Sequence, residues 1–507
     1  MSSDAVGLER VSRILGYKIT KGNFSESSQN LPQRVAILAE ANTANQSDLD
    51  TAGTEITSAL QAGQLYGFGS PIYHIMRILR PSSGGGIGGI VTKVYPQEEA
   101  VGATAKVVEV VATGTATGNG THTIRVSGRT GLEGTFYDIN IVSGDGADEI
   151  HAKIEDAINN VLASPVSAAS TDYEATLTTK WKGLTANDLA VTVDTNDSDL
   201  GITYAVTVIT AGSGTPSISN ALSQFGNDWV TIVVNGYGTH TNTLDTLEDF
   251  NGIPDPSNPT GRFASIVFKP FIAITGTVAD DPSAITDARL DDVTIALAPA
   301  PGSEGFPFEA AANMCVLFAR KSQDTPNLDV GGSSYSDMPV PLDGDIGSMA
   351  DYENRDLFVK KGCSTVDYVS GKYQVQDFVT TYHKLGEVPP QFRYCRNLML
   401  DFNVRYGYYL LELINVLDHS ISNDNDVVTA QNVVKPKQWK GILNSYADDL
   451  TVRGLVADAD FMKDSITVEI STVNPDRFET FFRYKRTGVV RIASTTAEAG
   501  FNFGSNI

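Results

Sequence analysis

A stretch rich in valine, threonine, alanine and glycine interrupts the chain between residues 91 and about 212, and it constrains the fold more than any other feature. Its apolar and polar residues alternate in short runs such as AKVVEVVATGTAT, separated by Gly, Asn and Asp, which indicates antiparallel strands. One helix is expected within it, from Ala147 to Leu162. Since different patterns flank this stretch on both sides, the sequence predicts a β-sandwich inserted into an α/β domain.

The flanking pattern before the stretch is strand, helix, strand. Residues 31–41 predict a buried strand, residues 49–66 a helix that ends at Gly67, and residues 71–79 a second strand. The glycine-rich run SSGGGIGGI at 82–90 predicts a flexible connection.

The α/β pattern resumes at residue 216. It predicts, in order, a helix over 217–226, a strand over 228–236, a helix over 241–252, strands over 262–271 and 293–301, and a small-residue helix over 308–321. Residues 322–350 are rich in Pro, Gly, Ser and Asp and predict a long loop.

The last region predicts two helices followed by paired strands. The helices are expected over 396–418, which carries an amphipathic spacing, and over 435–454. The runs SITVEIST and FETFFRYKR are joined by a turn at 474–477. Residues 477–492 carry five basic residues and one acidic residue. Either these strands have one solvated and one packed face, or a cationic sheet meets acidic surfaces on neighbouring copies.

The formal net charge of −23 is concentrated in the middle of the chain. Residues 1–90 have a net charge of 0 and residues 391–507 of −1, whereas residues 91–215 carry −9 and residues 216–390 carry −13. Because phosphate binding depends on clustered Lys and Arg, this distribution argues against nucleic acid as the main partner.

The cysteines and the chain's hydropathy restrict the cellular setting. Cys315, Cys363 and Cys395 have no paired spacing, so we expect buried thiols in a reducing compartment. We expect no membrane span, because no window approaches ~18 consecutive apolar residues. The first residues lack a long apolar segment and a plausible signal-cleavage site, so the chain is expected to be cytoplasmic when made.

Motif searches give no support for catalysis, a cofactor or a metal ion. The run at 82–90 lacks the lysine of a phosphate-binding loop, and SGDGADE and PLDGDIG lack the spacing of an EF-hand. The six histidines form no matched ligand pair. Cys363 with His383 is a chance pairing in a chain of this length. We therefore expect a protein that is not an enzyme.

Several short segments in order resemble the contractile tail sheath protein of Mu-like bacteriophages, of the myovirus tail sheath family. They are Gln64–Ser70 (QLYGFGS), Ala112–Ala116 (ATGTA), Gly212–Pro216 (GSGTP), Thr380–Tyr382 (TTY) and Asn474–Arg477 (NPDR). The family usually has Asp-Pro-Ala-Arg-Pro where this chain has Asp324–Leu328, so contacts of that loop are not transferred.

The resemblance implies a structural machine. Subunits of this family stack as hexameric rings around the tail tube, lock together through terminal arms that add strands to a neighbour's C-terminal sheet, and contract to drive the tube through the host envelope. The implied partners are further copies of the chain, the tail tube protein, and baseplate and tail terminator proteins. The implied location is the virion tail, after assembly in the host cytoplasm.

The expected fold is α+β and multidomain, with an α/β sheath core, an inserted antiparallel β-sandwich and extended terminal arms. The expected domains are an N-terminal arm (1–24), an α/β core in two parts (25–90 and 216–390), the insert on the outer surface (91–215), a C-terminal inner-lattice domain (391–487) and a C-terminal arm (488–507).

The candidate site residues are apolar and basic positions for strand exchange between subunits. The arm strands are expected to use Ile14, Leu15, Tyr17, Ile19, Val489, Val490 and Ile492. The neighbour-accepting sheet is expected to use Ile466, Val468, Ile470, Phe478, Phe481, Arg483 and Lys485.

Two other classes of protein are alternatives. A secreted or surface adhesin or glycan-binding protein fits the Thr/Gly-rich sandwich, but it would require a signal peptide and sugar-stacking aromatics. A hydrolase with an unrecognised site would require activity in isolated monomers. The sequence leaves open whether a sheath of this kind would belong to a phage, a tailocin or another injection device.

Overall fold

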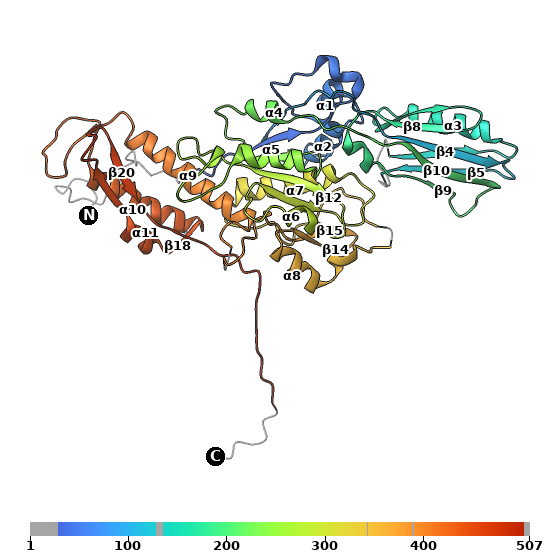
Figure 1. Ribbon diagram of the computed structural model, residues 1–507. Helices are drawn as coiled ribbons and strands as arrows, with labels where there is room; N and C mark the ends of the chain where they lie inside the picture. The colour runs from blue at the N-terminus through green and yellow to red at the C-terminus, as the bar shows by residue number, and fades with distance from the viewer. Residues whose placement is uncertain (1–28, 128–134, 342, 388–389, 501–507) are drawn as a thin grey trace, which may run out of the picture. The chain divides into compact units, whose positions relative to one another are not determined.

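The computed structural model describes residues 29–127, 135–341, 343–387 and 390–500. The described chain forms two compact units, which are considered separately below. The larger unit comprises residues 31–405, 454–457 and those from 485 onward; the smaller comprises residues 29–30, 406–453 and 458–484. The protein is thus a mixed α/β chain with several sheets, as the sequence predicted at this level (Figure 1).

A six-stranded sheet is the centre of the larger unit. Five strands run parallel in the order β13-β12-β11-β1-β3, and β2 (Thr54–Glu55) pairs antiparallel with β3 at the edge. The parallel strands are β1 (Arg34–Leu38), β3 (Val91–Val94), β11 (Ile232–Asn235), β12 (Ile272–Thr277) and β13 (Ile295–Pro299). Every residue of β11, β12 and β13 is buried, because helices cover both faces of the sheet.

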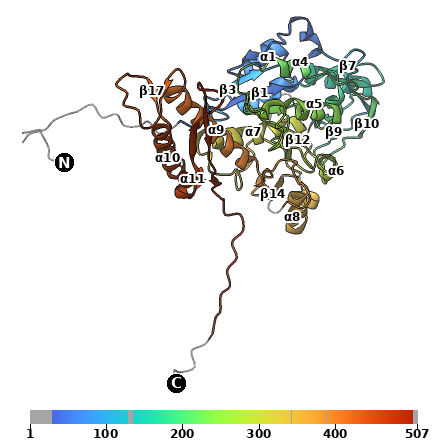
Figure 2. The same cartoon turned by 60° about the vertical axis from the view of Figure 1, so that its left-hand side comes forward.

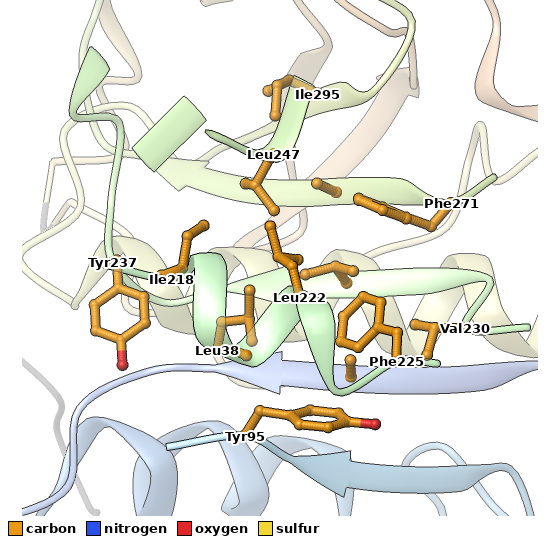
Figure 3. Packing of buried hydrophobic residues seen from close by; sticks show 14 of the residues in the cluster. Leu38, Tyr95, Ile218, Leu222, Phe225, Val230, Tyr237, Leu247, Phe271 and Ile295 are labelled. Carbon is orange, nitrogen blue, oxygen red and sulfur yellow. The ribbon is translucent and has the colours of Figure 1, made fainter. Parts of the chain in front are cut away.

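One face of this sheet packs against α4 (Ser219–Ser223) and α5 (Thr241–Asn251). Figure 3 shows Leu222 and Phe225 of this layer over the strands. The rings of Phe225 and Tyr95 have centroids 5.1 Å apart. The cluster is fully apolar on the strand side, where Ala36, Leu38, Val233, Ala273, Ile295 and Leu297 contribute.

The other face packs against α7 (Pro307–Asp324), which in turn packs against α2 (Pro71–Leu79). The helix approaches β12 so closely that a Cβ added to Gly276 would lie 1.6 Å from the carbonyl oxygen of Pro307. Shorter elements complete this part of the unit: η1 (Thr43–Asp48), α1 (Ala59–Tyr66), η3 (Gly261–Phe263), α6 (Ser283–Thr286), η4 (Gly347–Ala350), α8 (Tyr352–Lys360), β14 (Thr365–Val369) and β15 (Lys372–Asp377).

Two antiparallel sheets lie between β3 and α4 in the chain (Figure 1). The four-stranded sheet has the order β10-β4-β8-β7 and the three-stranded sheet the order β6-β5-β9. Their elements are β4 (Val107–Gly114), β5 (Gly120–Val126), β6 (Phe136–Ile141), α3 (Ala147–Asn159), β7 (Val166–Ser170), β8 (Ala175–Thr179), η2 (Leu184–Asp188), β9 (Val191–Asp194) and β10 (Ile202–Thr210). The antiparallel strands were predicted, whereas their packing as a sandwich and the domain bounds stay predictions. Residues 91–94 pair with β1, so the separate sheets begin at Val107.

The smaller unit is built from helices and a β-hairpin. The helices are the second part of α9 (Cys395–Asn415), α10 (Pro436–Val452) and α11 (Ala459–Ser465). The strands are β16 (Ser420–Ile421), β17 (Val433–Val434), β19 (Thr467–Ile470) and β20 (Phe478–Phe481). Two further short strands, β18 (Val456–Ala457) and β21 (Lys485–Arg486), pair with each other in the larger unit.

The strand predicted over residues 71–79 is wrong, since these residues form α2. Ser70 caps the helix by accepting the N–H of Tyr73 at 3.1 Å, and Pro71 occupies the first turn. The buried residues Ile72, Ile75, Met76 and Leu79 follow a helical spacing. A nine-residue apolar run fits either structure, and the Ser-Pro start was the deciding signal.

Two other expectations also fail locally. Of the helix predicted over 49–66, only residues 59–66 are helical. The strand predicted over 262–271 is wrong: η3 ends at Phe263 and a loop follows, closed where Lys269 N donates to Arg262 O at 2.9 Å, and the strand begins at Ile272. The buried guanidinium of Arg262 donates to the carbonyls of Gly226 and Asp228 and holds the loop in place.

We predict that Gly276→Ala destabilises the larger unit by about 1–3 kcal/mol, because α7 must move away from the sheet to admit a methyl group. Chemical denaturation measures the change. Gly89→Ala is the matched control, since a Cβ there meets no atom within 4 Å. Equal stability of the two variants would contradict the close packing of α7 on β12.

Candidate assembly interface

The hairpin of β19 and β20 is the core of the candidate interface. Its strands pair antiparallel, with Thr467 opposite Phe481 and Ile470 opposite Phe478. The predicted turn at Asn474–Arg477 joins them, and Ser471 N donates to Arg477 O at 2.9 Å. Ser465 extends the pairing, because its Oγ accepts the N–H of Arg483 at 2.8 Å.

The inner face of the hairpin packs on the helices of the smaller unit. Trp439 and Leu443 of α10 form a buried cluster with Val434 and Ile466. Partly buried side chains from α9, α10, the hairpin and adjoining residues pack against it: Tyr408, Leu411, Val416, Ile442, Val468, Phe478 and Phe482. Trp439 Nε1 donates to Thr480 Oγ1 at 3.3 Å, which fixes the register between helix and hairpin.

The outer face of the hairpin is exposed. It carries Glu469 directly opposite Glu479, and Phe481 with 52% of its surface accessible. Like charges opposite each other on a sheet are unfavourable, although the side chain of Arg477 lies 3.4 Å from Glu479. In the isolated subunit this face therefore gains little from the pairing.

Both edges of the hairpin are open in the part of the chain that the structure describes, where β19 and β20 pair only with each other. Each strand thus directs a row of N–H and C=O groups away from its partner. A two-stranded sheet is marginal by itself, and an added strand would satisfy these groups.

Six of the seven predicted acceptor residues lie together in the smaller unit. Ile466 is buried, whereas Val468, Ile470 and Phe478 are half-buried on the inner face. Phe481 and Arg483 are exposed, with the Arg483 guanidinium 5.5 Å from the Phe481 ring centroid. Lys485 belongs to the larger unit, where it pairs with Ala457.

The C-terminal segment is anchored on the larger unit before it extends. Arg486 donates to both carboxylate oxygens of Asp401, at 2.8 and 2.6 Å. From the other side, Arg396 donates to Thr487 and to the carbonyl of Asn327. Burial lowers the pKa of Arg396, but the guanidinium stays charged because its ordinary value is so high.

Arg491 is the last anchor. It forms ion pairs with Asp329 and with Asp377, the latter at 3.2 Å, and its guanidinium lies 3.7 Å from the centroid of the Tyr394 ring. Val489 lines the same cavity of about 450 Å³. Burial raises the pKa of Asp377, and the Arg491 charge opposes that rise.

The predicted arm residues of the C-terminal segment form no strand in the described chain. Val490 and Ile492 are 85% and 81% exposed, while Val489 is half-buried. Residues 493–500 are all exposed, and Figures 1 and 2 both show this stretch extended. The other predicted arm residues, Ile14, Leu15, Tyr17 and Ile19, lie outside the described residues.

The anchor made by Arg491, Asp329, Asp377 and Tyr394 was not predicted from the sequence. Arg491 was noted only as part of a basic run, and the two aspartates lie more than a hundred residues away in the chain. Neither spacing nor composition links these positions, so no signal in a single sequence identifies them.

Cys363 and His383, the pair considered as a nucleophile and base, have different hydrogen-bond partners. Cys363 Sγ lies 3.2 Å from Thr286 Oγ1, whereas His383 Nδ1 lies 2.7 Å from the carbonyl oxygen of Thr381. Burial raises the pKa of the Cys363 thiol to about 12, which disfavours a thiolate nucleophile. All three cysteines are buried free thiols, as predicted.

Neither a metal site nor a membrane-spanning helix is found within the described ranges. No group of three or more His, Cys, Asp or Glu side chains is placed to hold a metal ion among these residues. No helix in the described part of the chain is both long and apolar enough to cross a bilayer.

Comparison with known proteins points to the tail sheath proteins of Mu-like phages. The chain is 24% identical over 436 residues to the Mu-like prophage FluMu tail sheath protein of Haemophilus influenzae, and the match covers 83% of this chain and 84% of that protein. The resemblance predicted from the sequence is thereby confirmed. No protein-family model matches the chain.

Among solved structures, the sheath tail protein of Desulfitobacterium hafniense aligns over 93% of this chain and 100% of that chain. The alignment has 10% sequence identity and a TM-score of 0.44.

We predict that Arg491→Ala frees the segment from residue 488 onward, because it removes the two ion pairs and the ring contact that hold the segment beyond Thr487. Limited proteolysis measures the release as faster cleavage within 488–492. Arg477→Ala is the control, since Arg477 is 64% exposed and its single ion pair contributes little. An unchanged cleavage rate in Arg491→Ala would show that Arg491 is not the anchor.

Proposed function

We propose that this chain is a structural subunit of a contractile phage tail sheath and not an enzyme. The observation that carries the proposal is the similarity to the FluMu tail sheath protein, which spans more than four fifths of both chains. A match of this extent involves both structural units and the inserted sheets, rather than one shared domain.

The finer proposal is that copies polymerise into stacked hexameric rings around a tail tube and that the tube is driven through the host envelope when the sheath contracts. The further partners would be the tail tube protein and the baseplate and tail terminator proteins. The subunits would assemble in the host cytoplasm and reside in the virion tail. The acidic insert, with a net charge of −9 over residues 91–215, would project outward, where like charge separates finished particles.

Strand addition explains how such copies would remain connected. Within the described residues the hairpin has two open edges, and the C-terminal segment offers an extended chain with exposed apolar side chains at Val490 and Ile492. Backbone hydrogen bonds would supply the affinity, and the side-chain pockets the register. In this scheme the N-terminal positions Ile14, Leu15, Tyr17 and Ile19 would supply the second arm strand.

The anchor at Arg491 sets the reach of the C-terminal arm. The segment is held to its own subunit up to Arg491, so Ile492 and the residues beyond it can cross to a neighbour directly, whereas Val489 and Val490 can do so only after the anchor is released. The eight residues 493–500 can span roughly 26 Å when extended. In this proposal the extended segment bridges to an adjacent copy while the two folded bodies move relative to each other.

We predict that a chain ending at Arg491, which lacks Ile492 and every later residue, folds but forms no tubes. Among the described residues the deletion removes only exposed backbone, so circular dichroism and the melting temperature should match the intact protein, whereas electron microscopy should show no tubes. The control keeps the length and replaces residues 492–507 by a Gly/Ser sequence. Tubes of normal yield from the truncated chain would refute arm exchange, and persistent monomers of the intact chain at high concentration would refute the sheath proposal.

We also predict that a peptide of residues 487–507 inhibits polymerisation of the intact chain, because it competes for the open hairpin edges. Light scattering of assembling subunits measures the effect. A peptide of the same composition with Val489, Val490 and Ile492 replaced by serine should not inhibit. Equal inhibition by both peptides would contradict recognition through these apolar side chains.

A further inference from the structure

The parallel sheet has a place where folds of this kind bind ligands. From β1 the chain winds to β3 on one side, and then returns to β11 on the other side and continues to β12 and β13. The winding therefore reverses between β1 and β11. In open α/β sheets, ligands bind in the crevice beyond the carboxyl ends of the two strands at such a point.

In this protein, part of the insert fills that crevice. We call residues Trp181–Asp188 the plug segment. The Thr185 hydroxyl lies between the two strand ends: its Oγ1 donates to Glu40 Oε1 at 2.6 Å after β1, and a Cβ added to Gly238, after β11, would lie 3.9 Å from its methyl carbon. Thr185 and Trp181 are 2% and 0% exposed, so the plug segment is shielded from bulk solvent at this point.

The plug segment is tied both to the core and to the insert. Trp181 Nε1 donates to Thr185 Oγ1 at 3.1 Å, and Thr43 N donates to Lys180 O at 2.8 Å on the core side. On the insert side, Gly183 N donates to Thr104 O at 3.2 Å and Leu184 N donates to Gly214 O at 2.9 Å. The two connections between core and insert run through residues 104 and 213, which pair with each other. The plug segment, which bonds to these connections, therefore holds the insert as a whole against the core.

Glu40 is the chemically unusual member of this arrangement. Its side chain is 4% exposed, and Oε2 has no hydrogen-bond partner. Within the described residues, Glu40 has no ion-pair partner either. A carboxylate in this position would be a buried, uncompensated charge, whereas the neutral acid is tolerated.

The neighbouring charged groups reinforce the neutral form. Glu99 and Asp188 are acidic neighbours, and the phenol of Tyr237 lies on the β11 side. Two lysines are present but are engaged elsewhere. Lys182 Nζ lies 3.3 Å from Glu99 Oε2, and Lys106 Nζ donates to the carbonyl of Leu189 at 2.6 Å. Burial is the main cause that raises the pKa of Glu40 to about 8; the hydrogen bond from Thr185 opposes the rise, and the charges of Asp188 and Glu99 add to it.

We propose that the plug segment is a latch that seats the insert in the switch-point crevice of the core, and that ionisation of Glu40 opens it. The proton leaves the buried carboxyl to solvent, and the carboxylate is hydrated once Thr185 and the plug segment withdraw. The insert then moves on its two connections while the parallel sheet stays folded. This inference concerns the subunit itself and does not depend on whether the subunit forms a sheath.

The sign of the pH dependence follows from the direction of the shift. Because the carboxyl binds its proton more tightly in the folded state than in the unfolded chain, the latched state is fully favoured below about pH 4.5 and is weakened as the pH rises to about 8. Between about pH 4.5 and about pH 8, each further pH unit favours opening about tenfold, since opening is then coupled to loss of the proton, and above about pH 8 the dependence levels off because the carboxyl is ionised in both states.

Hydrogen exchange of the full-length chain tests the latch at about pH 6.5 and about pH 9, on either side of the Glu40 pKa, with correction for intrinsic rates. The probes are the amides of Thr43, Gly183 and Leu184, which bond across the crevice and the connections. We expect their protection to fall about thirtyfold in the wild type at the higher pH, because about 1.5 pH units separate pH 6.5 from the levelling-off near pH 8, and to stay constant in Glu40→Gln. Glu55→Gln, at an exposed position of the same sheet, should behave as the wild type.

Thr185→Val supplies an independent readout, because it removes the hydrogen bond to Glu40 and leaves the carboxyl in place. It should lower protection of the same amides at both pH values, while amides of β12 remain protected. Equal protection of the wild type at both pH values would overturn the proposal. The same pH dependence in Glu40→Gln as in the wild type would also overturn it.

Discussion

Burial of the parallel sheet on both faces is the constraint on which the rest of the structure depends. Strands β11, β12 and β13 contain no exposed residue, so each face needs a helical layer, supplied by α4 and α5 on one side and by α7 and α2 on the other. Gly276 shows how tight this layering is, because α7 contacts the backbone of β12 itself. Layers packed this densely move as rigid bodies and do not deform gradually, so a displacement of one layer is passed on to its neighbours.

The insert packs against this rigid sheet and its helices. The crevice at the carboxyl ends of β1 and β11 is filled by Trp181 and Thr185 instead of a small molecule. Because these side chains occupy the crevice, a fold that often binds a ligand there can serve as a structural subunit. The buried carboxyl of Glu40, whose Oε2 has no hydrogen-bond partner, remains as a costly group at this junction.

The candidate interface follows a different principle, in which hydrogen-bonding groups are left available. The β19–β20 hairpin is packed on one face by Trp439 and Phe482 and leaves both strand edges open in the described chain. The C-terminal segment is held by Arg486 and Arg491 up to a defined point and is exposed beyond it. Open edges and an exposed strand are a liability in a monomer, and they suit a protein whose stable state is an assembly.

The sequence by itself determined the order of elements and their periodicity. The alternating runs of residues 91–212, the buried strands and the helices at 308–321 and 435–454 are set by local patterns, which a chain carries wherever it folds. The short segments in order also sufficed to indicate the tail sheath proteins of Mu-like phages. The prediction for residues 71–79 failed because an apolar run of nine residues fits both the helical and the strand period, although Ser70 and Pro71 carried the signal for a helix start.

Only the tertiary structure decided which distant groups meet. Glu40 faces Thr185 across 145 residues, and Arg491 reaches Asp377 across 114. These contacts depend on where the insert packs and on the path of the last residues. Both follow from the sequence, but no local pattern in a single sequence reveals them.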